Sequence, residues 1–134
     1  MTGAERRKRV LFGCVENCNR SQMAEALARM YGAGQVEAFS AGCRPAASVH
    51  PKAIAAMREL GYDLEPHRSK GLGELPAVEF DVAVTMGCGE ECPALRAQRR
   101  EDWNVPCPKA MPPGQFRAVR GEIGERVQAL LAGL

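Results

Sequence analysis

Short apolar runs recur along the chain and predict the strands of a sheet. RVLFG at 9–13 lies between basic residues and a polar loop, as a buried strand does. VEAFSA at 36–41 alternates apolar and polar residues, which predicts a second strand. FDVAVTM at 80–86 is almost continuously apolar and suits a strand covered on both faces. DWNV at 102–105 is the expected short fourth strand.

Between these runs the hydrophobic period lengthens to three or four residues, which predicts helices. The first helix begins near Ser21 and ends at Gly32, and its apolar positions are separated by polar Gln22, Glu25 and Arg29. The second predicted helix spans 51–60, and a short helix or loop is expected at 69–75. The third predicted helix spans 116–134. Its apolar stripe consists of Phe116, Val119, Ile123, Val127, Leu130 and Leu134.

Alternation of strands and helices predicts an α/β fold, a three-layer sandwich with a four-stranded parallel sheet flanked by helices. We expect a single domain over 9–134, preceded by a basic N-terminal tail at 1–8. In such sheets ligands gather at the carboxyl ends of the strands. The loops after the first and third strands are both rich in cysteine, so they place their thiols at that edge.

Composition narrows the function classes. The chain has 134 residues, 46% of them hydrophobic, and a net charge of +2, which favours neither nucleic acid nor a membrane as a partner. No apolar stretch is long enough to span a bilayer, and the N-terminus lacks the features of a signal peptide. We therefore expect a cytoplasmic protein, in which the six cysteines are reduced and serve redox, catalytic or metal-binding roles.

The segment CVENCNRS, 14–21, places a thiol and an arginine between the first strand and the first helix. Among the cysteines only Cys14 has an arginine six positions later, Arg20. Free N–H groups and the dipole at a helix N-terminus attract an oxyanion, and an arginine adds a bidentate fork. The same field lowers the pKa of a thiol. The pattern predicts a nucleophilic Cys14 beside an oxyanion site.

The predicted oxyanion loop comprises Val15, Glu16, Asn17, Cys18, Asn19, Arg20 and Ser21. Two of its members have two interpretations each. Ser21 either caps the helix or hydrogen-bonds the thiolate, and Asn17 either stabilises the loop through its amide or supplies a left-handed turn. Neither His50 nor His67 has a partner that the sequence reveals, so surface or turn roles are expected for both.

CVENCNRSQMAEA, 14–26, resembles the anion loop and first helix of the low-molecular-weight tyrosine phosphatase fold, in particular its arsenate reductase branch. The resemblance continues through SAGCRP at 40–45, HRSK at 67–70, VTMGCGEECP at 84–93 and EDWNVP at 101–106. It covers nearly the whole chain after the tail. The combination of the loop with VTMGCGEECP is specific, whereas any one of these pieces alone would not be.

The resemblance implies a disulfide relay. Cys14 attacks arsenate, Cys88 then attacks the Cys14 sulfur and expels arsenite, and Cys92 moves the disulfide outward. It implies no bound cofactor but an external reductant: thioredoxin as the usual donor, or glutathione or mycothiol with a glutaredoxin-like protein. Phosphate and sulfate are the expected competing anions. Two alternatives remain for the C-x3-C pair of Cys88 and Cys92. The pair is either part of a zinc site, with Cys107 and Cys43 as further ligands, or a purely structural pair.

A late loop departs from the phosphatase pattern, both at the expected aspartate and at the aromatic residues after it, where Lys109 and Ala110 stand. Phosphatases of this fold carry an Asp-Pro pair that protonates the leaving oxygen, and here VPCPKAMPP at 105–113 places Cys107 where that aspartate is expected. A thiol is a poor substitute acid. We therefore expect an arsenate reductase with Cys14, Arg20, Cys88 and Cys92 as catalytic residues. The alternatives are a phosphatase of small phosphoesters and a non-catalytic oxyanion-binding or redox-sensing module.

Overall fold

The structure, a computed structural model, describes residues 7–14, 16–17, 19–42, 44, 46–76, 78–86, 97–108 and 110–134. Its elements are β1 (Lys8–Cys14), α1 (Arg20–Tyr31), β2 (Val36–Gly42), α2 (Pro51–Arg58), the one-turn 3₁₀ helix η1 (Leu72–Glu74), β3 (Phe80–Thr85), β4 (Ala97–Asp102) and α3 (Pro113–Ala132). The three predicted apolar strands and the three predicted helices are all present.

The sheet has the order β2-β1-β3-β4, and every neighbouring pair is parallel. In the register, Gly13 of β1 is paired with Ala41 of β2 and with Thr85 of β3, and Thr85 is paired with Asp102 of β4. The carboxyl ends of all four strands therefore lie at one edge. The predicted fold class, a four-stranded parallel sheet flanked by helices, is confirmed.

The predicted position of the fourth strand is wrong. The strand is β4, which shares only Asp102 with the expected segment 102–105. Its sequence AQRRED has no apolar alternation because β4 lies at the end of the sheet with its side chains mostly exposed. Backbone pairing with β3 makes it a strand. Trp103 and Val105 are buried as loop residues instead, and the Trp103 ring lies 5.9 Å from that of Phe12.

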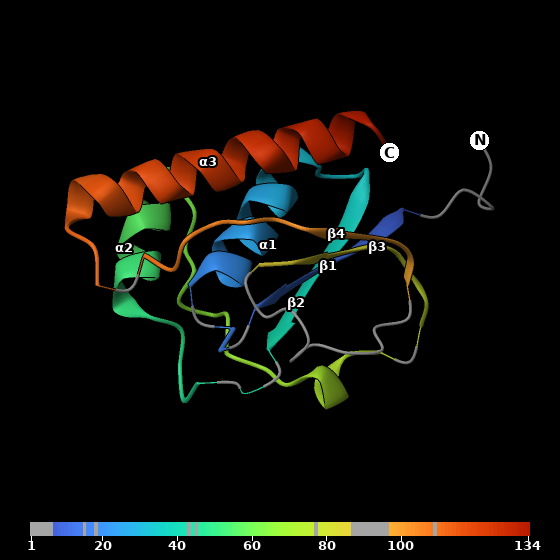
Figure 1. The fold of residues 1–134 in the computed structure, drawn as a ribbon, viewed down its shortest axis with the longest axis horizontal. Helices are drawn as coiled ribbons and strands as arrows, with labels where there is room; N and C mark the ends of the chain where they lie inside the picture. The colour runs from blue at the N-terminus through green and yellow to red at the C-terminus, as the bar shows by residue number, and fades with distance from the viewer. Residues whose placement is uncertain are drawn as a thin grey trace.

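The two faces of the sheet are covered differently (Figure 1). Helices α1, α2 and α3 lie on one face, where Phe12 and Val84 pack with α1 and α3 side chains such as Leu27 and Ile123. The other face has a smaller core, covered in the described chain by η1 and its flanking residues. Its members are Leu11, Ala41, Phe80 and Ala83, with Phe39, Leu72, Leu75, Val78 and Ala97 packed against them. No helix among the described residues is long and apolar enough to cross a membrane.

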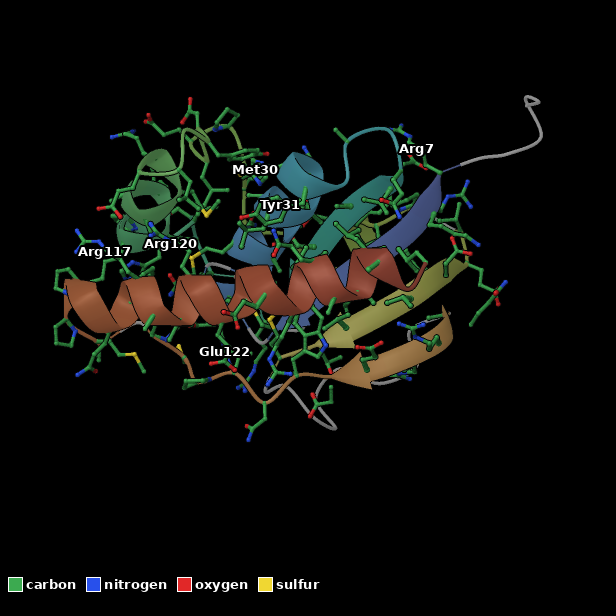
Figure 2. The ribbon with its side chains drawn as sticks, turned by 90° about the horizontal axis from the view of Figure 1, so that it is seen from above. Arg7, Met30, Tyr31, Arg117, Arg120 and Glu122 are labelled. Atoms are coloured by element: carbon green, nitrogen blue, oxygen red, sulfur yellow. The ribbon has the colours of Figure 1, made fainter. Side chains whose placement is uncertain are left out.

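Two local features hold the helices in place. A Cβ on Gly32, at the end of α1, would lie 2.9 Å from both the Ala28 carbonyl oxygen and the Val36 side chain, so the close approach to β2 requires glycine. On the opposite side of the helical layer, Arg117 and Arg120 of α3 lie beside α2 (Figure 2). Both arginines pair with the Glu59 carboxylate, at 2.9 and 2.8 Å.

Candidate active site

Cys14 lies at the junction between the sheet and α1. It is the last residue of β1, its exposed fraction is 3%, and α1 begins at Arg20. The hydrogen bond from Met23 N to Asn19 O (2.9 Å) opens the helical ladder. The N–H groups of Arg20, Ser21 and Gln22 precede that ladder, at the positive end of the helix dipole. The thiol is therefore placed beside a site suited to an anion.

Ser21 contacts the thiol directly. Its Oγ lies 2.9 Å from Cys14 Sγ and accepts a hydrogen bond from Asn17 Nδ2 at 2.8 Å. A thiolate has no proton to donate, so Ser21 must be the donor when Cys14 is ionised. The helix N-cap is Asn19, so the capping alternative for Ser21 is wrong. For Asn17 both interpretations hold, since its φ is +50° and its amide bonds Ser21.

The loop that follows Cys14 is held from outside by a distant segment. The Glu16 carbonyl oxygen accepts hydrogen bonds from Ser69 Oγ (2.7 Å) and from Ala46 N (2.9 Å). The amide N–H of Lys70 donates to Asn17 Oδ1 at 2.9 Å. These partners come from parts of the chain far away in sequence, so the loop conformation depends on the whole fold.

Arg20 connects α1 to the loop after β4. Its Nη1 donates to the Val105 carbonyl oxygen at 2.8 Å, across 85 positions of sequence. A guanidinium has five N–H donors, so this bond leaves others for an anion at the start of α1. Cys107, two residues after Val105, is exposed. The position that departs from the phosphatase pattern therefore belongs to a loop anchored to Arg20.

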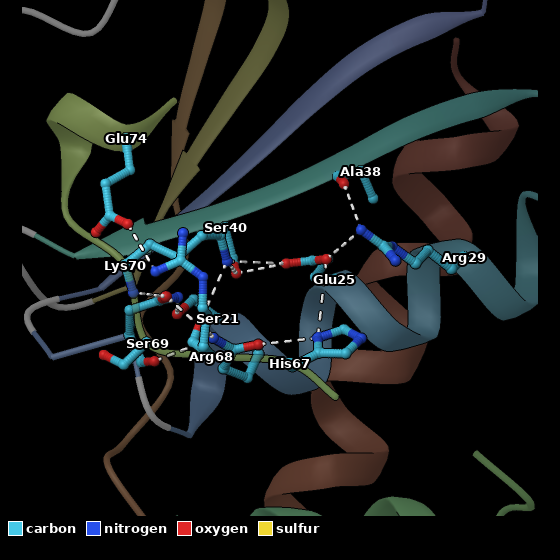
Figure 3. A network of polar contacts seen from close by, with 12 residues as sticks. Ser21, Glu25, Arg29, Ala38, Ser40, His67, Arg68, Ser69, Lys70 and Glu74 are labelled. Carbon is cyan, nitrogen blue, oxygen red and sulfur yellow. Dashed lines mark hydrogen bonds and ion pairs between the residues drawn. The ribbon is translucent and has the colours of Figure 1, made fainter. Parts of the chain in front are cut away.

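Sequence reasoning missed a buried polar network beside this loop (Figure 3). Glu25, on the face of α1 expected to be polar, is 3% exposed and accepts a hydrogen bond from Ser40 Oγ. Arg29, Lys70 and His67 surround its carboxylate, with nitrogen–oxygen distances of 2.5, 3.8 and 3.8 Å. Gln22, one turn earlier, is fully buried as well. Gln22 and Glu25, on the face of α1 expected to be polar, therefore contact protein rather than water.

Burial shifts the pKa of two groups of this network, His67 and Lys70. Desolvation lowers the pKa of His67 from its ordinary value, and Glu25 only partly opposes that shift. Desolvation also lowers the pKa of Lys70. His67 is 9% exposed and bonds Tyr62 and Gln22, so the expected surface role is wrong for it. His50 is the N-cap residue of α2, where its Nδ1 accepts a hydrogen bond from Lys52 N. In the sequence, the spacing of Gln22, Glu25 and Arg29 along one helix face was the signal that could have indicated this polar network.

Several predicted site residues lie outside the described residues: Val15, Cys18, Cys43, Cys88 and Cys92. The structure brings together Cys14, Asn17 and Ser21, and it connects Arg20 to the loop that carries Cys107. In the part of the chain that the structure describes, no group of three or more His, Cys, Asp or Glu side chains is arranged to hold a metal ion. The proposed pairing of Cys14 with Cys88 and Cys92 stays a prediction.

Comparisons with known proteins agree with this architecture. The chain is 38% identical to a glutaredoxin arsenate reductase of Synechocystis sp. over 93% of its own length and 97% of the relative's. A solved arsenate reductase in a phosphate-binding state superimposes with a TM-score of 0.86 at 38% identity, covering 94% of this chain and 98% of the other.

A thioredoxin-dependent arsenate reductase of Corynebacterium glutamicum has a TM-score of 0.78 at 30% identity and covers 97% of this chain, which spans 63% of that protein. Residues 9–134 match the family described as low molecular weight phosphotyrosine protein phosphatase. A parallel sheet whose first strand ends in a buried cysteine at the start of α1, together with these full-length matches, shows that the chain belongs to the low-molecular-weight phosphotyrosine protein phosphatase family.

Proposed function

We propose that the protein is an arsenate reductase in which Cys14 is the nucleophile. The observation that carries the proposal is the position of Cys14 Sγ, 2.9 Å from Ser21 Oγ at the N-terminus of α1. The hydroxyl and the helix dipole both favour a thiolate. Full-length relatives named arsenate reductases support the choice of substrate.

The first step is displacement at arsenic. The anion binds at the N–H groups at the start of α1, with the remaining donors of Arg20 on its oxygens. The Cys14 thiolate attacks arsenic(V), an arsenic–sulfur bond forms, and one hydroxide leaves, taking up a proton to become water. Cys107 occupies the position expected to deliver that proton, and its thiol is a weaker acid than a carboxyl group. Solvent is therefore the proton source in this proposal.

The second step transfers two electrons. The Cys88 thiolate attacks the Cys14 sulfur, a disulfide forms, and the sulfur–arsenic bond breaks with its electron pair staying on arsenic, which leaves as arsenite. Cys92 then attacks Cys88 and releases Cys14 as a thiolate, so the disulfide moves to Cys88 and Cys92. An external thiol donor in the cytoplasm reduces that disulfide.

The donor decides between two forms of the proposal. We place thioredoxin first, the donor named for the Corynebacterium relative, and a small thiol with a glutaredoxin-like protein second, as the Synechocystis relative's name indicates. Arsenite production is measured with thioredoxin and its reductase, and in parallel with glutathione or mycothiol and a glutaredoxin. Activity with one system names the donor. Activity with neither system contradicts the proposed function.

The relay has its own test. After one equivalent of arsenate, Cys92→Ser is expected to release one equivalent of arsenite and accumulate a Cys14–Cys88 disulfide, which mass mapping detects. Cys88→Ser is expected to stop before arsenite release. Multiple turnover by Cys92→Ser at the rate of the unsubstituted protein would instead favour direct attack of a small thiol on the Cys14 adduct.

A phosphatase of small phosphoesters is the second candidate. The family to which the chain belongs and the anion-binding geometry at α1 favour it. The exposed Cys107 disfavours it, because an alkoxide leaving from phosphorus needs a proton more than arsenic reduction does.

A further inference from the structure

A continuous row of side-chain hydrogen bonds runs from Tyr62 to the sulfur of Cys14. The links are Tyr62 OH to His67 Nε2 (2.8 Å), His67 Nδ1 to Gln22 Oε1 (3.0 Å), Gln22 Nε2 to Asn17 Oδ1 (3.0 Å), Asn17 Nδ2 to Ser21 Oγ (2.8 Å) and Ser21 Oγ to Cys14 Sγ (2.9 Å). Tyr62 is partly buried, whereas Asn17, Ser21 and Gln22 are completely buried.

Backbone groups determine the orientation of the two amides in this row. The Lys70 N–H can only donate, and it donates to Asn17 Oδ1, so Asn17 Nδ2 must face Ser21. Gln22 Nε2 faces the carbonyl oxygens of Asn17 and Arg68, which can only accept. Gln22 Oε1 therefore faces His67.

These orientations determine the remaining protons. Because Gln22 Oε1 can only accept, His67 carries its proton on Nδ1 and leaves Nε2 to accept from the Tyr62 hydroxyl. Ser21 accepts from Asn17 and has its own proton to give to the thiolate. Every bond in the row thus donates in the same direction, toward the sulfur.

Aligned hydrogen bonds polarise one another, by an estimated 10–30% per bond in a low-dielectric interior. We propose that Tyr62 and His67 are positioning residues that stabilise the Cys14 thiolate through Gln22, Asn17 and Ser21. The inference deepens the proposed function, since it rests on Cys14 being the nucleophile. Neither Tyr62 nor His67 is in contact with Cys14, and the buried side chains between them carry the effect.

Charged groups around His67 decide the pH range in which the row is intact. Glu25 and Arg29 face it from α1, and Asp63 and Lys70 lie on its own segment. Burial lowers the pKa of His67, so the neutral form is stable at neutral pH. Protonation in acid would place a hydrogen on Nε2, which could then no longer accept from Tyr62. The polarisation is therefore present above the pKa of His67 and lost below it.

The test measures the ionisation of Cys14 without any arsenate. The whole chain is alkylated with iodoacetamide over a range of pH, and the rate at Cys14 is followed by peptide mass spectrometry. Tyr62→Phe keeps the ring and removes only the hydroxyl. We expect the midpoint of its profile of alkylation rate against pH to move to higher pH. Its alkylation rate at neutral pH should fall roughly twofold, and its rate at high pH, where the thiol is fully ionised, should be unchanged.

Matched variants separate polarisation from a merely structural role. Tyr31→Phe changes a tyrosine that is 44% exposed at the far end of α1, and it should leave the midpoint unchanged. His67→Ala should raise the midpoint further than Tyr62→Phe, and His67→Gln, which can donate to Gln22 and accept from Tyr62, should restore it. Ser21→Ala, which removes the last link, should give the largest rise.

An unchanged midpoint in Tyr62→Phe and His67→Ala, with a raised midpoint in Ser21→Ala, would overturn the inference. A changed rate at high pH with an unchanged midpoint would also overturn it, because that result reports access to the thiol. If the unsubstituted protein failed to reduce arsenate while the midpoints shifted as expected, the result would contradict the proposed function but not this inference.

Discussion

The two thiols that the structure describes lie at the same edge of the sheet, and their surroundings are opposite. Cys14 is the last residue of β1, is 3% exposed and has a hydroxyl partner at the start of a helix. Cys107 comes five residues after β4 and is exposed. Arg20 joins the two loops through the Val105 carbonyl. We therefore expect the reactive thiol to be Cys14, beside the helix terminus and its donors, and not the exposed Cys107.

The largest expected effect comes from removing each thiol in turn. Cys14→Ser should abolish arsenite production and leave the fold intact, because a serine hydroxyl is almost wholly protonated at neutral pH and attacks poorly. Cys107→Ser is the matched control and should keep most of the activity. Steady-state arsenite production and thermal unfolding are measured for both. More than a trace of activity in Cys14→Ser would show that Cys14 is not the nucleophile.

The next prediction concerns Cys107, which occupies the position expected for a general acid. Cys107→Asp should raise aryl phosphate hydrolysis by about 10²–10⁴-fold, the range that general acid catalysis typically supplies. Arsenate reduction should change less, because solvent can protonate the oxygen that leaves arsenic. Rates with both substrates are compared on the two proteins. A selective fall in arsenite production would instead indicate a redox role for Cys107.

Arg20→Lys tests the link between the two loops. A lysine keeps the charge but has no planar fork, so it cannot hold the Val105 carbonyl and two oxygens of an anion together. We expect the KM for arsenate to rise about tenfold with a smaller change in kcat. Arg126→Lys, a surface arginine paired with Glu122, is the control. Equal effects of the two substitutions would argue against an anion contact by Arg20.

The smallest effect concerns the ion cluster between α2 and α3, remote from both thiols. Hydrogen bonds from Arg117 and Arg120 lower the pKa of Glu59 to about 2, from 4.5. The folded-state pKa is depressed, so the stabilisation is present above pH 4.5 and is lost as the pH falls toward 2. The cluster is exposed and screened by solvent, so the effect is small.

Glu59→Gln should therefore lower the Tm by a few degrees at most at neutral pH. The difference from the unsubstituted protein should narrow as the pH approaches the pKa of Glu59, as thermal unfolding at several pH values would measure. Alkylation of Cys14 and Cys107 should be unchanged. A difference in Tm that grows in acid would contradict the assigned direction of the pKa shift.

The alternation of strands and helices, and with it the fold class, could be predicted from the sequence alone. Apolar periodicity is a local property, so β1, β2, β3 and α3 could be recognised without knowing their neighbours. The position of Cys14 between a strand and a helix was also readable in the same way. Its role as nucleophile stays a prediction, as do the roles of Cys88 and Cys92.

Which polar residues are buried, and what they contact, depends on how distant segments pack together. Gln22 and Glu25 look like the solvent side of a helix, yet they are buried by partners at 40 and 67–70. The strand β4 likewise exists through pairing with β3 rather than through its own side chains. Hydrogen bonds across long stretches of sequence leave no periodic trace in either partner. The fold alone brought Tyr62, His67 and the loop of Cys14 together.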